Sequence, residues 1–205
     1  MVFAQNSESE VVLGMTDRPA VGAIIKRHKS LHRWLIKAFD GQFSKSKIRW
    51  ENDDSNLPSN SLGQHSYTDG YAIVTVSHKP CPIDQLTILI YECVNVRYES
   101  IFRALYKSVS AGRIQREDFV TKMMQTEHKA MLVTQRVLRR NLPLTRKEAA
   151  GAAGYRKLIG EPHDFAASMQ YYEKTKRDEF DVRDYYRSVY DQLFGKAPLP
   201  PLWIQ

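Results

Sequence analysis

Apolar residues recur at every third or fourth position over residues 19–39, a period that predicts an amphipathic helix. The same period runs through two longer stretches, 83–110 and 115–140, and predicts two long helices. Pro82 suits the first turn of the earlier long helix, and Gly112 suits its end. The middle of the chain is therefore expected to form two long helices joined by a short turn.

The last third of the chain is also predicted to be helical. Thr145 begins a short segment with the Thr-x-x-Glu spacing of a capping box, in which side chains satisfy the free backbone groups of the first turn. Residues 164–194 form a tyrosine-rich helical region, with a break expected near Asp178. The proline-rich tail at 196–205 is expected to be extended.

Two stretches contain the residue types of β-strands. Residues 71–78 are rich in β-branched side chains and follow the turn pair Asp69-Gly70, whereas residues 47–52 are a shorter candidate. Residues 52–66 are rich in Asn, Ser, Asp and Pro, which predicts a loop.

Together these elements predict an α+β fold that is mostly helical, with four to five helices packed with a small antiparallel sheet. A single domain is expected over residues 19–195, between an N-terminal tail at 1–18 and the C-terminal tail. No run of about 18 apolar residues is present, so no membrane span is expected in a soluble protein. The segment "MVFAQNSE" resembles the trimmed end of a secretory signal, which leaves export and the compartment open.

The formal net charge of +7 raises the question of an acidic partner. Short basic clusters occur at 26–29, 136–140 and 174–177, interspersed with other residues. A nucleic-acid site would need such clusters to converge on one face, so solvated helix faces are the favoured interpretation. The two cysteines, Cys81 and Cys93, are expected about 15 Å apart along a helix and therefore unpaired.

Candidate chemistry is concentrated in "LIYECVNV" at residues 89–96. On a helix, Tyr91 and Asn95 share one face with Glu92 beside them, which is the geometry of the zinc-binding His-Glu-x-x-His motif. The order of strand, loop and motif helix also matches. Tyr91-Glu92-Cys93-Val94-Asn95 thus resembles a zincin active-site helix in which both histidines have been replaced.

The resemblance extends over residues 70–130, and in the gluzincin branch it implies an acidic zinc ligand on the next helix. Glu127 is the matching residue, and it lies at the height of Glu92 if the two long helices are antiparallel. The departure is at the ligands, because neutral amide and phenol oxygens suit zinc poorly. We therefore expect no zinc or other cofactor, and a relative without peptidase activity.

Binding in a cleft between the strand at 71–77 and the two long helices is the first functional hypothesis, with an unidentified protein or peptide as ligand. The expected lining residues are Trp50, Tyr71, Tyr91, Asn95, His78 and His128. The simpler alternative is a structural network in which Glu92 accepts hydrogen bonds within a packed core.

Three further alternatives stay open. A hydrolase would use Glu92 as general base, with or without a metal held by Glu127, His128 or His78. Cys81 beside His78 offers a thiol nucleophile. A basic adaptor would bind an acidic protein or nucleic acid through the tyrosine-rich C-terminal helices.

Overall fold

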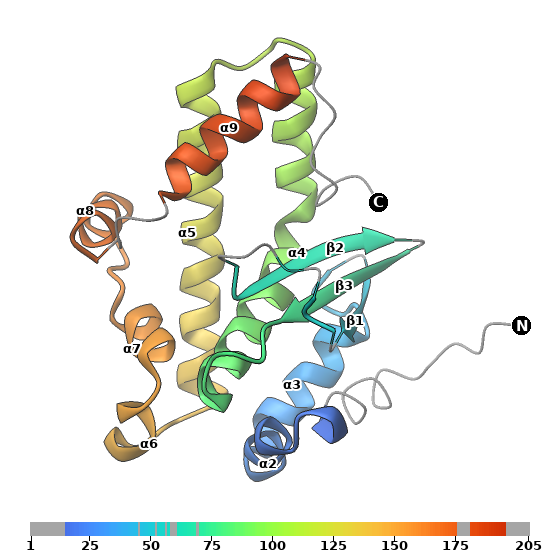
Figure 1. The fold of residues 1–205 in the computed structure, drawn as a ribbon, viewed down its shortest axis with the longest axis vertical. Coiled ribbons are helices and arrows are strands. Elements are labelled where there is room, and N and C mark those ends of the chain that lie inside the picture. The colour runs from blue at the N-terminus through green and yellow to red at the C-terminus, as the bar shows by residue number, and fades with distance from the viewer. Residues whose placement is uncertain are drawn as a thin grey trace, which may run out of the picture.

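Two long helices, α4 (Pro82–Ser110) and α5 (Arg116–Asn141), run antiparallel through the molecule in the computed structural model (Figure 1). Both predicted long helices are therefore confirmed to within a residue or two at their ends. Gly112 has a φ of +66° in the turn between them, a conformation that favours glycine. The structure describes residues 15–44, 46–51, 53–55, 57, 61–68, 70–175 and 181–195.

The N-terminal helical region is divided into two helices, where the hydrophobic period predicted one. α2 (Pro19–Arg27) and α3 (Lys29–Phe39) meet at His28, whose backbone lies outside the helical region at φ −105° and ψ 80°. Ile25 and Leu31, on successive helices, are both fully buried. Periodicity alone did not indicate the bend, because three- and four-residue spacings continue across it.

The sheet is mixed rather than antiparallel. β3 (Tyr71–Val76) pairs in parallel with β1 (Lys47–Glu51) and antiparallel with β2 (Gly63–Thr68), in the order β1-β3-β2. The strands predicted near 47–52 and 71–78 are confirmed. The loop prediction for 52–66 is wrong at its end, because β2 begins at Gly63.

The inner face of the sheet packs on α4. Side chains alternate along a strand, so Trp50, Val74 and His65, which occupy paired positions on the three strands, share one face. All three are buried. Tyr71 has the opposite parity and lies on the outer face, where the guanidinium of Arg49 lies 3.9 Å from its ring centroid.

The C-terminal region contains more helices than expected. Its elements are α6 (Arg146–Ala150), α7 (Ala153–Gly160), α8 (Phe165–Thr175) and α9 (Val182–Phe194). With α2 to α5, they exceed the four to five helices predicted. Gly151 caps the end of α6, and Pro162, which has no backbone N–H, lies between α7 and α8. The capping box at Thr145 is confirmed, since Thr145 and Glu148 exchange both hydrogen bonds. The predicted break at Asp178 and the tail at 196–205 lie outside the described residues.

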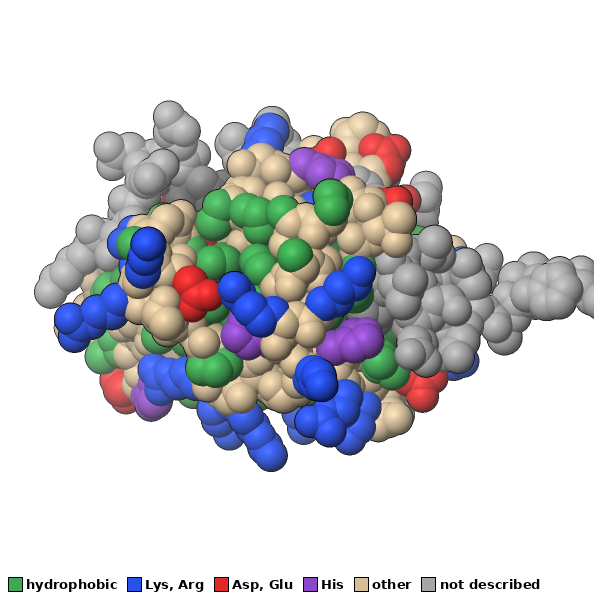
Figure 2. All heavy atoms as spheres, turned by 90° about the horizontal axis from the view of Figure 1, so that it is seen from below, with side chains coloured by type: hydrophobic (Ala, Val, Ile, Leu, Met, Phe, Trp, Pro, Cys, Tyr) green, Lys and Arg blue, Asp and Glu red, His purple; other side chains and the backbone are tan. Residues whose placement is uncertain are grey.

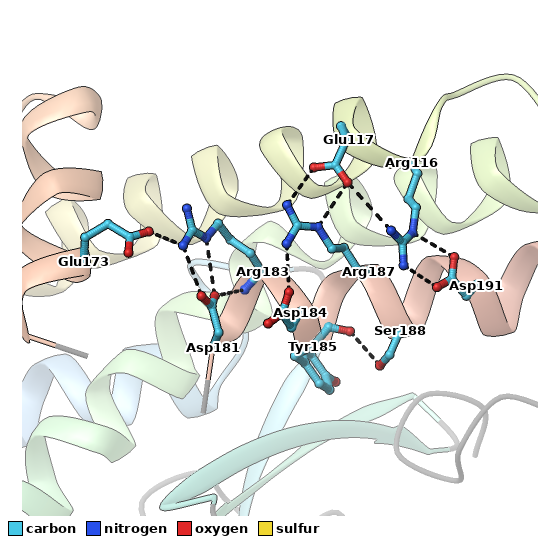
Figure 3. Close-up of polar contacts among 10 residues, drawn as sticks. All are labelled: Arg116, Glu117, Glu173, Asp181, Arg183, Asp184, Tyr185, Arg187, Ser188 and Asp191. Carbon is cyan, nitrogen blue, oxygen red and sulfur yellow. Dashed lines mark hydrogen bonds and ion pairs between the residues drawn. The ribbon is translucent and has the colours of Figure 1, made fainter. Parts of the chain in front are cut away.

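Helix α9 is attached to α5 by exposed ion pairs (Figure 3). Arg116 binds Asp191 through two nitrogens, and Arg187 bridges Glu117 and Asp184 at 3.0 and 2.8 Å. Exposed pairs contribute little stability each. Their effect here is to neutralise the basic side chains of α9.

The hydrophobic core consists of two clusters separated along α4 and α5. One joins the sheet to α2, α3, α7 and the lower halves of the long helices as drawn in Figure 1, and the other joins α9 to their upper halves. Among the described residues, no helix is long and apolar enough to cross a membrane. Between the clusters lies a layer of polar side chains, which contains the candidate site.

The two cysteines are unpaired, as expected, and differ in exposure. Cys93 is buried in the core and burial raises the pKa of its thiol, whereas Cys81 is partly exposed at the start of α4. We expect one thiol to react rapidly with a disulfide reagent in the native protein, and both to react after unfolding. Cys81→Ser should remove the rapid reaction, and rapid reaction of Cys93 would contradict the packing described.

Candidate functional site

The carboxylate of Glu127 joins three helices. Tyr91 on α4 donates a hydrogen bond to one carboxylate oxygen, and Tyr186 on α9 donates to the other at 2.6 Å. These contacts put the motif helix and Glu127 at the same height, as the antiparallel arrangement predicted. Both carboxylate oxygens of Glu127 are thus occupied by side chains of the protein itself.

The protonation of this cluster is shifted toward its neutral forms. Burial raises the pKa of Glu127 above its ordinary value of 4.5 and the charge of Glu92 adds to the rise, although the two tyrosine hydroxyls oppose it. Burial, followed by the charge of Glu127, raises the pKa of Tyr91 and of Tyr186 well above 10. The two tyrosines therefore stay protonated and donate over the physiological pH range.

Glu92 is held by a residue that the predicted site omitted. The Nδ1 of His65 on β2 donates to a carboxylate oxygen of Glu92 at 2.8 Å, and both side chains are buried. The signal for His65 was present in the sequence. Alternating residues before Asp69-Gly70 are typical of the first strand of a hairpin, which would have placed His65 opposite Val74.

Asn95 completes the polar layer on α4. Its side chain hydrogen-bonds to Tyr91 one turn earlier, as expected for residues four apart on one helix face. The residue is only 3% exposed, and its Oδ1 has no hydrogen-bond partner among the described residues. Asn95 therefore belongs to the interior and does not line an open cleft.

Two adjoining pockets lie beside this layer, where α7 faces α4 and α5. The smaller, about 260 Å³, is lined by Glu127, and the larger, about 710 Å³, is lined by Glu92. Their shared walls are Tyr91, Gly154, Lys157 and Leu158. We refer to the two pockets together as the Tyr91 groove.

The walls of the Tyr91 groove are mostly apolar. Met124, Met131 and Met169 line the smaller pocket, whereas Leu62 and Ile88 line the larger one near the start of β2. Flexible methionine side chains adapt to ligands of different shape. Such a groove suits a ligand with apolar side chains better than a strongly charged one.

The remaining predicted residues are dispersed. Trp50 is buried on the inner face of the sheet, whereas Tyr71 is on the outer face. His78 is exposed, and its Nδ1 lies 3.4 Å from Asp54 and 3.2 Å from Arg18. None of these three lines the Tyr91 groove. His128 does line it, and its Nε2 donates to the Pro162 carbonyl at 3.2 Å.

Each of the candidate metal ligands interacts with a different partner. Glu127 faces two tyrosines, His128 faces Pro162, and His78 lies with Asp54 beyond the start of α4. Within the described part of the chain, no three His, Cys, Asp or Glu side chains are grouped to hold a metal ion. No hydrogen bond joins Cys81 to His78 among these residues either.

No match to the chain was found among protein-family models, curated proteins or solved structures. The functional assignment consequently rests on the geometry of the site, and the zincin resemblance stays a prediction.

The raised pKa of Glu127 predicts a pH-dependent contribution to stability. Between pH 4.5 and that raised pKa, the folded protein binds more protons at this residue than the unfolded chain, so stability falls as pH rises. The advantage of the wild type over Glu127→Gln, measured by urea unfolding, should be largest below pH 4.5 and shrink through the folded pKa. Glu117→Gln is the control of opposite sign, because Arg187 lowers the pKa of Glu117. A difference for Glu127→Gln that grows with pH would contradict the assignment.

Removing the Tyr186 hydroxyl should loosen the junction of α5 and α9. Tyr186→Phe leaves a partly buried carboxylate oxygen of Glu127 without its donor, at an expected loss of about 1.5–3 kcal/mol in the free energy of unfolding. Tyr98→Phe is the matched control, since no hydrogen bond to the Tyr98 hydroxyl is present among the described residues. Equal effects of the two substitutions in chemical denaturation would show that the Tyr186–Glu127 contact is not special.

Proposed function

We infer that the protein is a non-catalytic binding protein with a zincin-like core, which holds an extended peptide segment in the Tyr91 groove. The observation that carries this proposal is the set of residues that line the larger pocket. Leu62 and Gly63 at the start of β2 line it, together with Tyr91 and Glu92 of α4 and Lys157 and Leu158 of α7. A sheet edge and an apolar groove therefore lie next to each other.

The position of β2 supports a peptide ligand in particular. β2 is the outer strand in the order β1-β3-β2, so its second edge pairs with no other described strand. Extended peptides add to such edges through main-chain hydrogen bonds, and alternate side chains then enter adjoining pockets. The apolar walls around Leu62 and Ile88 would receive those side chains.

The partners of the two carboxylates favour binding over hydrolysis. A general base needs a carboxylate oxygen within hydrogen-bond reach of an attacking water. Glu92 accepts from His65, and Glu127 accepts from Tyr91 and Tyr186. Each acid thereby positions an element of the fold: β2 in the first case, α4 and α9 in the second. The hydrolase alternative would have to use the other carboxylate oxygen of Glu92, because His65 donates to Oε2.

A charge placed at the mouth of the groove tests this proposal. Leu62 is 50% exposed, so Leu62→Asp should cost little stability but should oppose the entry of apolar side chains. Against an array of 12-residue peptides, we expect the wild type to bind a subset rich in apolar residues. Leu62→Asp should weaken that binding by about tenfold, equivalent to about 1.4 kcal/mol.

Ile101→Asp is the matched control, because Ile101 is also exposed, at 42%, and lies on α4 outside the groove. It should leave peptide binding unchanged. The bound peptides should remain intact by mass spectrometry. Absence of binding, or equal loss in both variants, would contradict the proposal, and cleavage abolished by Glu92→Gln would favour the hydrolase.

A further inference from the structure

A second groove, independent of the Tyr91 groove, lies where α3, α4 and α5 meet. Its volume is about 680 Å³. Five of its lining residues are basic, and none is acidic; the basic residues are Arg33, Lys37, Arg97, Arg136 and Arg140. We refer to it as the basic groove.

Helix geometry explains how these charges come together. Arg33 and Lys37 are four residues apart on α3, and Arg136 and Arg140 are four apart on α5, so each pair shares one helix face. Arg97 on α4 supplies the fifth charge between them. The cluster at 136–140 thus meets basic residues of two other helices, which is the convergence that a nucleic-acid site requires. Figure 2 shows Lys and Arg side chains spread over the lower end of the molecule, with several of them along one edge.

Among the described residues, the five cations have no acidic partner. Arg136 donates a hydrogen bond to the Leu132 carbonyl, which is within its own helix. Four arginines elsewhere do have carboxylate partners; they are Arg27, Arg103, Arg116 and Arg187. Five like charges repel one another at close range, a cost that an anionic ligand would remove.

The ion pairs of α9 count against the C-terminal helices as the site of an acidic partner. The C-terminal helices were the predicted surface for an acidic partner, but Arg183 and Arg187 of α9 are matched by Asp181 and Asp184 there (Figure 3). The cluster at 174–177 extends beyond the described residues. The basic groove, by contrast, has five basic and no acidic lining residues.

Aromatic rings accompany the charges. Trp34 and Phe43 stack with their centroids 5.6 Å apart, and Phe43 is 36% exposed. Tyr98 lines the same groove. Guanidinium groups bind phosphates in a bidentate manner, and exposed aromatic rings stack on unpaired bases.

From this combination we propose that the basic groove binds single-stranded nucleic acid. The cations contact successive phosphates, and Phe43, with Tyr98, stacks on bases. A duplex conceals its base faces within the stack and so leaves the rings without a role. An acidic peptide satisfies the charges but also has no planar group to offer.

The salt dependence of binding to a fluorescein-labelled oligothymidylate of about 20 nucleotides tests the charge contacts. Each neutralised phosphate of a single strand contributes about −0.7 to the slope of log K against log salt concentration, so four or five contacts give a slope of about −3. Arg136→Gln/Arg140→Gln should reduce the steepness by about 1.4. Fluorescence anisotropy between about 20 and 200 mM salt measures both values.

Lys122→Gln/Lys129→Gln is the matched control, since it removes the same charge from exposed positions of α5 outside the groove. It should leave the slope unchanged. Phe43→Ala should weaken binding by about tenfold without altering the slope, because stacking releases no counterions.

Several results would overturn the proposal. They are absence of binding at low salt, equal loss in both double variants, and an unchanged affinity in Phe43→Ala. Tighter binding to duplex DNA, to polyglutamate or to vesicles with anionic headgroups than to the oligothymidylate would assign the groove to that partner instead. Leu62→Asp should bind the oligothymidylate as the wild type does, which separates this site from the Tyr91 groove.

Discussion

The relative positions of α4, α5 and α9 depend on one partly buried carboxylate. Glu127 accepts from Tyr91 and from Tyr186, so α4, α5 and α9 meet at a single side chain midway along the long helices. Apolar packing is not directional and would tolerate sliding of one helix along another. The hydrogen bonds are directional, and a register shift of one turn would leave a buried carboxylate without donors, which is costly. The polar layer therefore fixes the helix register that the apolar clusters only permit.

The same polar layer shapes the candidate site. Tyr91 forms a shared wall of the two pockets, and its ring is held in place because its hydroxyl binds Glu127. His65 plays the corresponding part for the sheet, since its contact with Glu92 anchors β2 to α4. A motif that resembles a catalytic helix has, in this chain, partners suited to holding elements together. That difference is the reason why we propose ligand binding rather than catalysis for the surrounding groove.

Elements with a long, uninterrupted pattern were predictable from the sequence, and those defined by tertiary partners were not. α4, α5 and β3 follow from periodicity and β-branched residues. β2 is short and polar, and it forms a strand because it pairs with β3. The residue types alone therefore predict a loop over its first half. Glu92 and Glu127 were expected at one height and are electrostatically coupled, whereas His65 and Tyr186, which hold them, come from distant segments. The face of the sheet on which Trp50 and Tyr71 lie follows only from the strand pairing. The basic groove likewise follows only from the convergence of three helices.

The division of the core into two clusters has a consequence for folding cooperativity. The cluster around α9 includes Phe102, Phe119 and Val189 and is separated from the sheet cluster by the polar layer. Such a unit can open by itself, exposing the upper halves of α4 and α5 while the sheet stays formed. Backbone amides near Phe119 would then exchange with solvent deuterium through a smaller opening free energy than amides of β3. The molecule would then unfold as two coupled cooperative units, which the hydrogen bonds of Glu127 join.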